Sequence, residues 1–230
     1  MSERIPLPPP TQALTSTTFV PPPHDLSLTV PEIIDFHRTH SPNHVVYVYE
    51  DSPGECKQIN FSTWIRAIHR AGRCVHNLFR LSESKACGGK PIISLLANSG
   101  EGCPTVFLPF EYVNLTLTDT ITYGTTKLGI IRAGSVAFAI SPRNSAAGIA
   151  HLINKTGTQH VLVTPDLKPL MDATIAILKE LEGTIIPAVQ SMPTFKDFFP
   201  DDEEEDFEYL PEPDATGPDD PICILHSSGV

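Results

Sequence analysis

The sequence lacks the cysteine spacings that build metal sites and disulfide frameworks. Its five cysteines are odd in number, and no two of them form a CxxC pair. Structural zinc sites and small secreted domains need such paired spacings. No apolar run reaches the ~18 residues of a membrane span, and no hydrophobic stretch of a signal peptide follows the N-terminus. We therefore expect a protein of the reducing cytoplasm without a membrane partner.

Basic residues are scarce relative to acidic ones. The chain holds 16 Lys and Arg against 27 Asp and Glu, a net charge of −11. Because nucleic-acid binding requires a basic face, this balance argues against a nucleic-acid partner. The acidic excess is concentrated in residues 197–220, which contain no Lys or Arg. We interpret this segment as a solvated acidic loop kept open by self-repulsion, with a protein-docking patch as the alternative.

The common fingerprints of nucleotide and hydrolase sites are missing as well. The sequence has no GxGxxG, no GxxxxGK[ST] and no GxSxG, so a dinucleotide fingerprint, a Walker loop and a nucleophile elbow are excluded. His69 and His76 are seven residues apart and have no carboxylate at ligand spacing. A helical metal pair needs a separation of four residues, so we expect both histidines on the polar face of a helix.

Proline, in contrast, is abundant. The chain has 23 prolines, roughly twice the usual ~5%, and they cluster at the N-terminus and in residues 187–221. Residues 1–30 contain two Pro-Pro-Pro runs and no apolar periodicity. This segment therefore predicts an extended, disordered tail.

From residue 31 onwards, apolar strands and capped helices alternate. The pattern predicts a short helix from Pro31, a hairpin over residues 44–61 and a long helix capped by Ser62. Further helices are expected between the caps and stops formed by Asp119 and Gly134, Ser145 and Gly157, and Asp166 and Gly183. Apolar strands are expected at 91–97, 136–140, 160–164 and 184–189. This alternation predicts an α/β fold with a mostly parallel sheet flanked by helices.

Three stretches of the chain resemble adenylate-forming enzymes. They are "INFSTWIRAIHRAGRCVHNL" (59–78), "TTKLGIIRAGSVAFAISPRNSAAGIAHLINKTG" (125–157) and "ICILHSSG" (222–229). Within that superfamily the details "SPRNS", "AHL" and "LHSSG" are most similar to fungal adenylate-forming reductases, which are related to nonribosomal peptide synthetases. The resemblance covers roughly residues 31–230, and it implies the N-terminal part of the large adenylation (AMP-binding) domain.

The resemblance also implies a reaction. Such enzymes use ATP with Mg²⁺ to convert a carboxylic acid into an acyl-adenylate, and then pass the acyl group to a phosphopantetheine thiol on a carrier. In the reductases an NADPH-dependent domain follows. Ser227, Ser228 and Gly229 match the beginning of the family's Gly-rich loop, whose backbone N–H groups hold the ATP phosphates. These three residues are the ATP-binding residues that the resemblance assigns to this chain, and it assigns no catalytic or metal-binding residue.

The sequence departs from the family pattern in two places. The family continues Ser-Ser-Gly with Ser-Thr-Gly, a variable residue and Pro-Lys, whereas this chain continues with Val230 alone. The family also runs from "LLANS" directly into "DTITY", whereas residues 100–118 intervene here. Unspliced introns translated into protein would explain both departures. A genuine insertion loop and an unrelated C-terminus are the alternative.

Two function classes remain open beside the enzyme. On the first reading the chain is a fragment of an adenylation enzyme and is inactive alone. On the second reading it is a noncatalytic interaction protein derived from such a domain. A defined stoichiometric partner that binds with no dependence on nucleotide would favour this reading. A third reading, a small α/β nucleotide-binding module, would be favoured by micromolar ATP binding.

Overall fold

The computed structural model of the chain describes residues 16–23, 25, 27–52, 55–79, 90–100, 118–202, 206–213 and 220–226. The chain divides into two compact units, Met1–Ile65 and Arg66–Val230. Within the described ranges no helix combines the length and the apolar character needed to cross a membrane.

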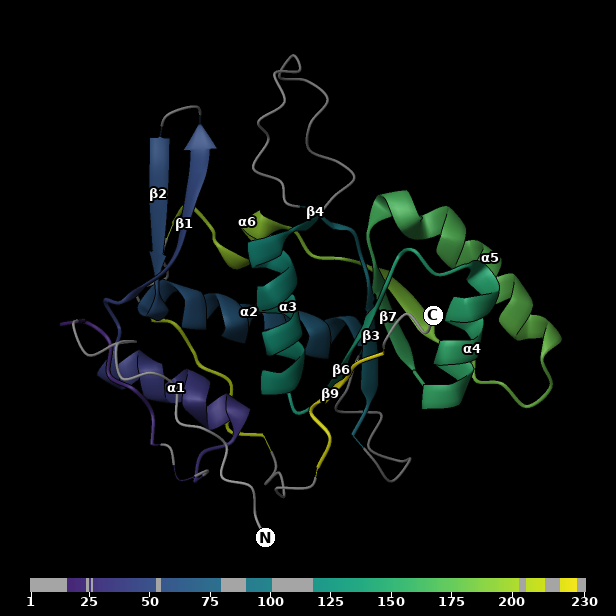
Figure 1. Cartoon of the computed structure of the whole chain (residues 1–230), viewed down its shortest axis with the longest axis horizontal. Helices are drawn as coiled ribbons and strands as arrows, with labels where there is room; N and C mark the ends of the chain where they lie inside the picture. The colour runs from purple at the N-terminus through teal and green to yellow at the C-terminus, as the bar shows by residue number, and fades with distance from the viewer. Residues whose placement is uncertain are drawn as a thin grey trace, which may run out of the picture. The chain divides into compact units, whose positions relative to one another are not determined.

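The first unit contains a helix and a hairpin. Helix α1 (Val30–His40) begins with a capping box, in which the Glu32 carboxylate accepts hydrogen bonds from the backbone N–H (2.6 Å) and hydroxyl (2.7 Å) of Thr29. Strands β1 (Val45–Ser52) and β2 (Glu55–Asn60) then pair antiparallel, as the sequence predicted (Figure 1).

Aromatic rings and histidines form the centre of this unit. The His37 ring packs against Phe19 (5.1 Å) and Phe61 (4.3 Å), whose own centroids are 6.4 Å apart, and the Val20 N–H donates to the Ser41 hydroxyl (2.9 Å). Burial lowers the pKa of His37, and the neighbouring His44 and His40 lower it further. Phe19 and Val20 are therefore held by the fold, although the proline pattern assigned them to a disordered tail. The Phe19 ring contacts and the hydrogen bond to the Ser41 hydroxyl outweigh the local composition.

Helix α2 (Phe61–Phe79) starts two residues earlier than the sequence indicated. The Asn60 side chain accepts a hydrogen bond from the Thr63 N–H (2.9 Å), which makes Asn60 the cap and places the expected cap, Ser62, inside the first turn. The predicted apolar stripe is confirmed, since the helix buries the following side chains almost completely: Ile65, Ile68, Ala71 and Val75.

A five-stranded parallel sheet organises the second unit. Its strands are β3 (Ile92–Leu96), β6 (Val136–Ile140), β7 (His160–Val163), β8 (Ala188–Ser191) and β9 (Cys223–Ile224), in the spatial order β8-β7-β3-β6-β9. Val136, Phe138 and Ile140 are at most 3% exposed, which confirms the predicted buried parallel strand. The predicted α/β class is confirmed.

Helices cover both faces of this sheet. Helix α3 (Thr120–Arg132) lies on one face, and α4 (Ala146–Thr156) and α5 (Lys168–Glu180) lie on the other (Figure 1). The predicted caps are confirmed at Asp119, which accepts from the Thr122 N–H (2.7 Å), and at Ser145, which accepts from the Gly148 N–H (3.2 Å). Apolar side chains of β3, β6 and β7 pack against α4 and α5 to form a continuous core: Leu96, Phe138, Ile140, Ile149, Ile153, Val161, Val163, Met171 and Leu178.

Helix α3 buries Ile130 and Ile131, but much of its buried surface is made of small and polar residues. Ile121 and Leu128 are only partly buried, whereas Thr122, Thr126 and Gly129 are buried. The reason is a close approach to α2, where a Cβ on Gly129 would lie 2.5 Å from the Ala71 Cβ. Small side chains are required at such a crossing, so size outweighs hydrophobicity in choosing the face.

Strand β8 begins four residues later than predicted. Ile185 and Ile186 are 60% and 41% exposed and belong to no strand. Pro187 has no N–H to donate to a neighbouring strand, and the ladder with β7 starts at Ala188, whose N–H donates to the Gln159 carbonyl (2.9 Å).

Residues 206–213, hereafter the strap, run across helices α2 and α3. The Arg73 guanidinium donates to the Glu208 carbonyl (2.8 Å), and Arg132 donates to the carbonyls of Leu210 (2.9 Å) and Pro211 (2.6 Å). The Phe207 ring, 9% exposed, lies under the guanidinium groups of Arg70 and Arg73 at 4.9 and 4.7 Å.

The strap revises two sequence interpretations. Its acidic side chains Asp206, Glu208 and Glu212 are exposed, as expected of an acidic loop, but its backbone is anchored rather than kept open by repulsion. His69, expected on a polar helix face, is fully buried, and its Nδ1 accepts the Leu210 N–H (2.9 Å). The arginines bind carbonyl oxygens, which no count of acids and bases reveals.

Candidate functional site

The carboxyl ends of the parallel strands form the candidate site. In open α/β sheets ligands bind outside this edge, at the point where the connections of two neighbouring strands run in opposite directions. Here the chain leaves β3 towards β6 on one side, and leaves β7 towards β8 on the other. The crossover point therefore lies between the residues that follow β3 and those that follow β7.

Polar side chains meet at this crossover point. The Asn98 amide donates to Oδ2 of Asp166 at 2.5 Å, which joins the segments after β3 and β7. Oδ1 of Asp166 and Oγ1 of Thr164 are buried and have no hydrogen-bond partner in the described part of the chain. Thr164 is only 2% exposed. Buried oxygen atoms without a partner are unusual, and they mark this edge as a place where polar groups are held ready for a ligand or water.

A hollow of about 290 Å³ opens at the same edge. It is lined by Ala97 and Asn98 after β3 and by Pro142 and Arg143 after β6. The Arg143 side chain is exposed. A guanidinium and an amide at the mouth of a hollow provide hydrogen-bond donors suited to an anionic group.

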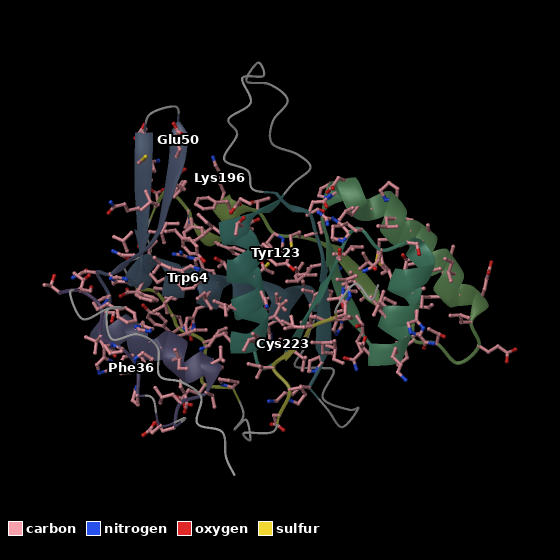
Figure 2. The ribbon with its side chains drawn as sticks, viewed as in Figure 1. Phe36, Glu50, Trp64, Tyr123, Lys196 and Cys223 are labelled. Carbon is pink, nitrogen blue, oxygen red and sulfur yellow. The ribbon has the colours of Figure 1, made fainter. Side chains whose placement is uncertain are left out.

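Strand β9 brings the C-terminal part of the chain to this edge. Cys223 and Ile224 pair with Ala137 and Phe138 of β6 in parallel; Cys223 is labelled in Figure 2. His226 follows, and its Nε2 accepts the backbone N–H of Ser141 at 3.2 Å. Ser227, Ser228 and Gly229, the residues that the sequence assigned to ATP, lie outside the described residues. The described chain leads up to them at the carboxyl edge.

His226 was missed by sequence reasoning. The available signal was its position immediately before Ser-Ser-Gly. A single histidine, however, forms no motif with a second residue at a recognisable spacing. Only the parallel pairing of β9 with β6 brings its ring to the turn after β6.

The described residues include no cluster of metal-ligating side chains. They contain no group of three His, Cys, Asp or Glu side chains that could hold a metal ion. Mg²⁺ is usually bound by one or two carboxylates together with substrate phosphates, so this finding assigns no described residue to it.

His160 has a perturbed pKa but lies at the opposite edge. Burial lowers the pKa of this imidazole, which is 9% exposed and 4.3 Å from the Phe79 ring. His160 is the first residue of β7, so it lies at the amino end of the sheet. A perturbed pKa is a guide to function only in a site, and here we attribute it to core packing.

Comparison with known proteins points to one group of enzymes. No family model matches the chain. The chain is 34% identical over 229 residues to adenylate-forming reductase Nps10 of Heterobasidion annosum, which covers 98% of this chain and 19% of the relative. It is 28% identical over 215 residues to adenylate-forming reductase Nps9 of Serpula lacrymans, covering 90% and 17%. The chain thus spans about a fifth of the length of these curated relatives.

Solved structures share the fold. A fatty acyl CoA synthetase of Mycobacterium tuberculosis matches with a TM-score of 0.57 at 16% identity, over 86% of this chain and 32% of that one. The N-terminal domain of FACL13 from the same organism also gives 0.57, at 14% identity, over 87% and 42%. The nonribosomal peptide synthetase FmoA3 in its AMPPNP-bound form gives 0.50 at 16% identity, over 86% and 16%. These matches confirm the expected fold.

Proposed function

Because the chain is a relative of the adenylate-forming reductases over nearly its whole length, as three of its stretches indicated, we propose that it forms the first part of a carboxylate-activating module. In the proposed reaction an oxygen of a carboxylic acid attacks the α-phosphate of ATP. The bond to pyrophosphate breaks, and an acyl-adenylate and pyrophosphate result. A phosphopantetheine thiol of a carrier then takes the acyl group and releases AMP.

The observation that carries this proposal is the placement of β9. Strand β9 runs towards the carboxyl edge of the parallel sheet, and His226 lies beside the turn that follows β6, immediately before Ser227-Ser228-Gly229 in the sequence. A loop that starts there presents successive backbone N–H groups, which bind phosphate oxygens. Mg²⁺ supplies charge neutralisation in such reactions, but the described residues do not hold it, so we derive no step through it.

We further propose that the 230-residue polypeptide does not form acyl-adenylate alone. Each donor directed at the developing charge of such a transition state is worth several kcal/mol, and the described residues provide only the approach to the phosphate loop. We expect no carboxylate-dependent exchange of labelled pyrophosphate into ATP by this polypeptide, across a panel of aromatic, aliphatic and amino acids.

A chimera supplies the matching positive case. Residues 1–229 are joined to the part of Nps10 that follows its own matching region and completes its adenylation domain. We expect pyrophosphate exchange from this chimera with at least one acid, and its loss in the variant with Ser227→Ala and Ser228→Ala. A folded chimera that is inactive with every acid would refute the activation proposal. Exchange by the 230-residue polypeptide would refute the claim that it is inactive alone.

We also propose that residues 100–118 are an insertion outside the conserved fold. Ser99 pairs with Thr118 and Gly100 with Asp119, in strands β4 (Ser99–Gly100) and β5 (Thr118–Asp119), so the two ends of the segment meet. Paired strands lie ~4.8 Å apart, and consecutive Cα atoms ~3.8 Å apart. The gap left by removing the segment is therefore short. Residues 101–117 lie outside the described residues.

Deleting residues 100–118 should preserve the fold and increase the soluble yield. The segment contains many apolar residues in the run "CPTVFLPFEYV". Such runs favour aggregation when they are not packed in a core. Circular dichroism and urea unfolding test the fold, and soluble expression tests the yield. Replacing 101–117 by a Gly-Ser linker of the same length is the control for loop length. Unfolding of the deletion variant, with the linker variant also unfolded, would show that the segment belongs to the core.

A further inference from the structure

We propose that His226 is a positioning residue, which ties the start of the phosphate-binding loop to the turn after β6 through its neutral ring. This inference rests on the proposed function, because it assigns a role within the same site. The tether itself is a property of the described residues and is measurable without any nucleotide.

The geometry places His226 where the strand pairing ends. Only Cys223 and Ile224 of β9 pair with β6, so the ladder stops two residues before His226. The His226 ring continues the attachment, because its Nε2 accepts the Ser141 N–H at 3.2 Å. The ring also meets the fully buried Phe138 ring edge-on, with centroids 6.0 Å apart and planes at 81°. A side chain therefore holds the chain at the point where the backbone ladder no longer does.

The other end of the tether is a well-defined turn. The Ser141 carbonyl accepts the backbone N–H of Asn144 (3.2 Å) and its side-chain amide (3.1 Å). The Ser141 hydroxyl accepts the Arg143 N–H (3.3 Å). These bonds engage the carbonyl and the hydroxyl oxygen of Ser141, and His226 accepts its backbone N–H. His226, the last described residue, is thereby joined to a turn that follows the central strand β6.

The chemistry of this bond requires a neutral imidazole. A backbone N–H can only donate, so Nε2 of His226 must carry its lone pair and the ring hydrogen must be on Nδ1. A protonated ring has no lone pair on Nε2, so protonation breaks the tether and leaves the Ser141 N–H without its acceptor.

The charged groups near the ring do not replace this bond. Residues 136–145 and 221–226 contain no acidic side chain, and their only cation is Arg143. Cys223 is the other titratable group on β9. Asp220, before β9, is paired with Lys90 at 3.2 Å, and Asp166, after β7, accepts from the Asn98 amide. No carboxylate on the turn or on β9 would hold the ring in place once it is charged.

NMR on the 230-residue protein tests the tether. At neutral pH we expect the ring ¹⁵N shifts of His226 to report hydrogen on Nδ1. On acidification the Ser141 amide should shift together with the His226 Cε1 proton, with one common midpoint. His226→Phe keeps a ring against Phe138 but lacks an acceptor, so the pH response of Ser141 should disappear. His226→Gln, which keeps an acceptor oxygen, should retain a Ser141 amide shift typical of a hydrogen bond.

A matched control and a functional measurement complete the test. His151→Asn changes an exposed histidine of α4 and should leave the Ser141 response unchanged. In the Nps10 chimera, His226→Phe should reduce pyrophosphate exchange roughly tenfold, the factor expected for one lost hydrogen bond, and His226→Gln should restore most of it. Protonation of the His226 ring should reduce the pyrophosphate exchange of the wild-type chimera as well. This reduction should be absent in the His226→Phe chimera.

The outcomes separate the two proposals. A Ser141 amide that does not follow His226 overturns the tether, whatever the chimera does. If the Ser141 amide does follow His226, but the wild-type and His226→Phe chimeras exchange pyrophosphate equally well, the positioning role of His226 is overturned. If the Ser141 amide follows His226 but the folded chimera exchanges no pyrophosphate with any acid, the proposed function is overturned, and with it the role of the tether in ATP binding. The hydrogen bond itself is then still established.

Discussion

Replacing Gly129 with alanine should lower the free energy of unfolding of the second unit by about 3 kcal/mol, the upper part of the range for overpacked sites. A Cβ at this position would lie 2.5 Å from the Ala71 Cβ, 2.8 Å from the Gly72 nitrogen and 2.9 Å from the Ala71 carbonyl carbon. Two of these atoms belong to the backbone of α2, so the clash cannot be relieved by a rotamer change. The helix has to move, and the packing of α3 on the sheet moves with it.

Gly148→Ala provides the matched control for this substitution. Gly148 is also in a helix of the second unit, and a Cβ there would find its nearest neighbours at 3.5 and 3.7 Å, ordinary contact distances. Alanine is a better helix former than glycine by about 1 kcal/mol, so this variant should be unchanged or slightly more stable. Urea unfolding followed by circular dichroism measures both. Equal stability of the two variants would show that the α2–α3 crossing is looser than described.

Arg132→Met should cost roughly 3 kcal/mol and release the strap. Arg132 is 2% exposed and donates to two carbonyl oxygens, those of Pro211 (2.6 Å) and Leu210 (2.9 Å). Hydrogen bonds from a charged donor contribute about 1.5–3 kcal/mol each, and methionine retains the length of the side chain without its donors. Arg132→Lys should recover only part of the loss, because an ammonium does not reproduce the planar fork of the guanidinium.

Two measurements read this effect. Urea unfolding gives the stability, and limited proteolysis detects new cleavage within residues 206–213. Arg143→Met removes an exposed arginine and should change the stability by less than about 0.5 kcal/mol. An Arg132→Met protein that is destabilised but resists cleavage in the strap would contradict the anchoring described above. The arginine would then act only within the α2–α3 packing.

Local signals in the sequence were sufficient for most of the sheet and for two helix caps, but not for the start of β8 or for α5, which begins at Lys168 with Leu167 rather than Asp166 at its N-cap. Asp119 and Ser145 were correct as caps because an N-cap is decided by the side chain and the next three residues. The strand 136–140 was correct because a short apolar run between two helices has few alternatives. These features depend on neighbours along the chain, which is why the sequence shows them.

Features that depend on distant residues were not predictable in the same way. The strap is bound by Arg73 and Arg132, which are far from it in sequence and bind its carbonyl oxygens, a group that every residue carries. The buried face of α3 includes Ile130 and Ile131, but the space beside Ala71 also requires Gly129 there. At the candidate site, the resemblance named Ser227, Ser228 and Gly229, whereas the Asn98–Asp166 pair and the His226 tether required the strand order.

The strand order also fixes the sequence of events during synthesis. Strands β3, β6, β7 and β8 are complete once residue 191 has been made, and they already form a contiguous four-stranded sheet. The edge of β6 remains open until residues 223 and 224 emerge from the ribosome, since these alone pair with it in the described chain. Contacts between residues so distant in sequence form slowly, and an open strand edge is a point of misassembly in a nascent chain. Among the described strands, β9 is thus the last to join the sheet.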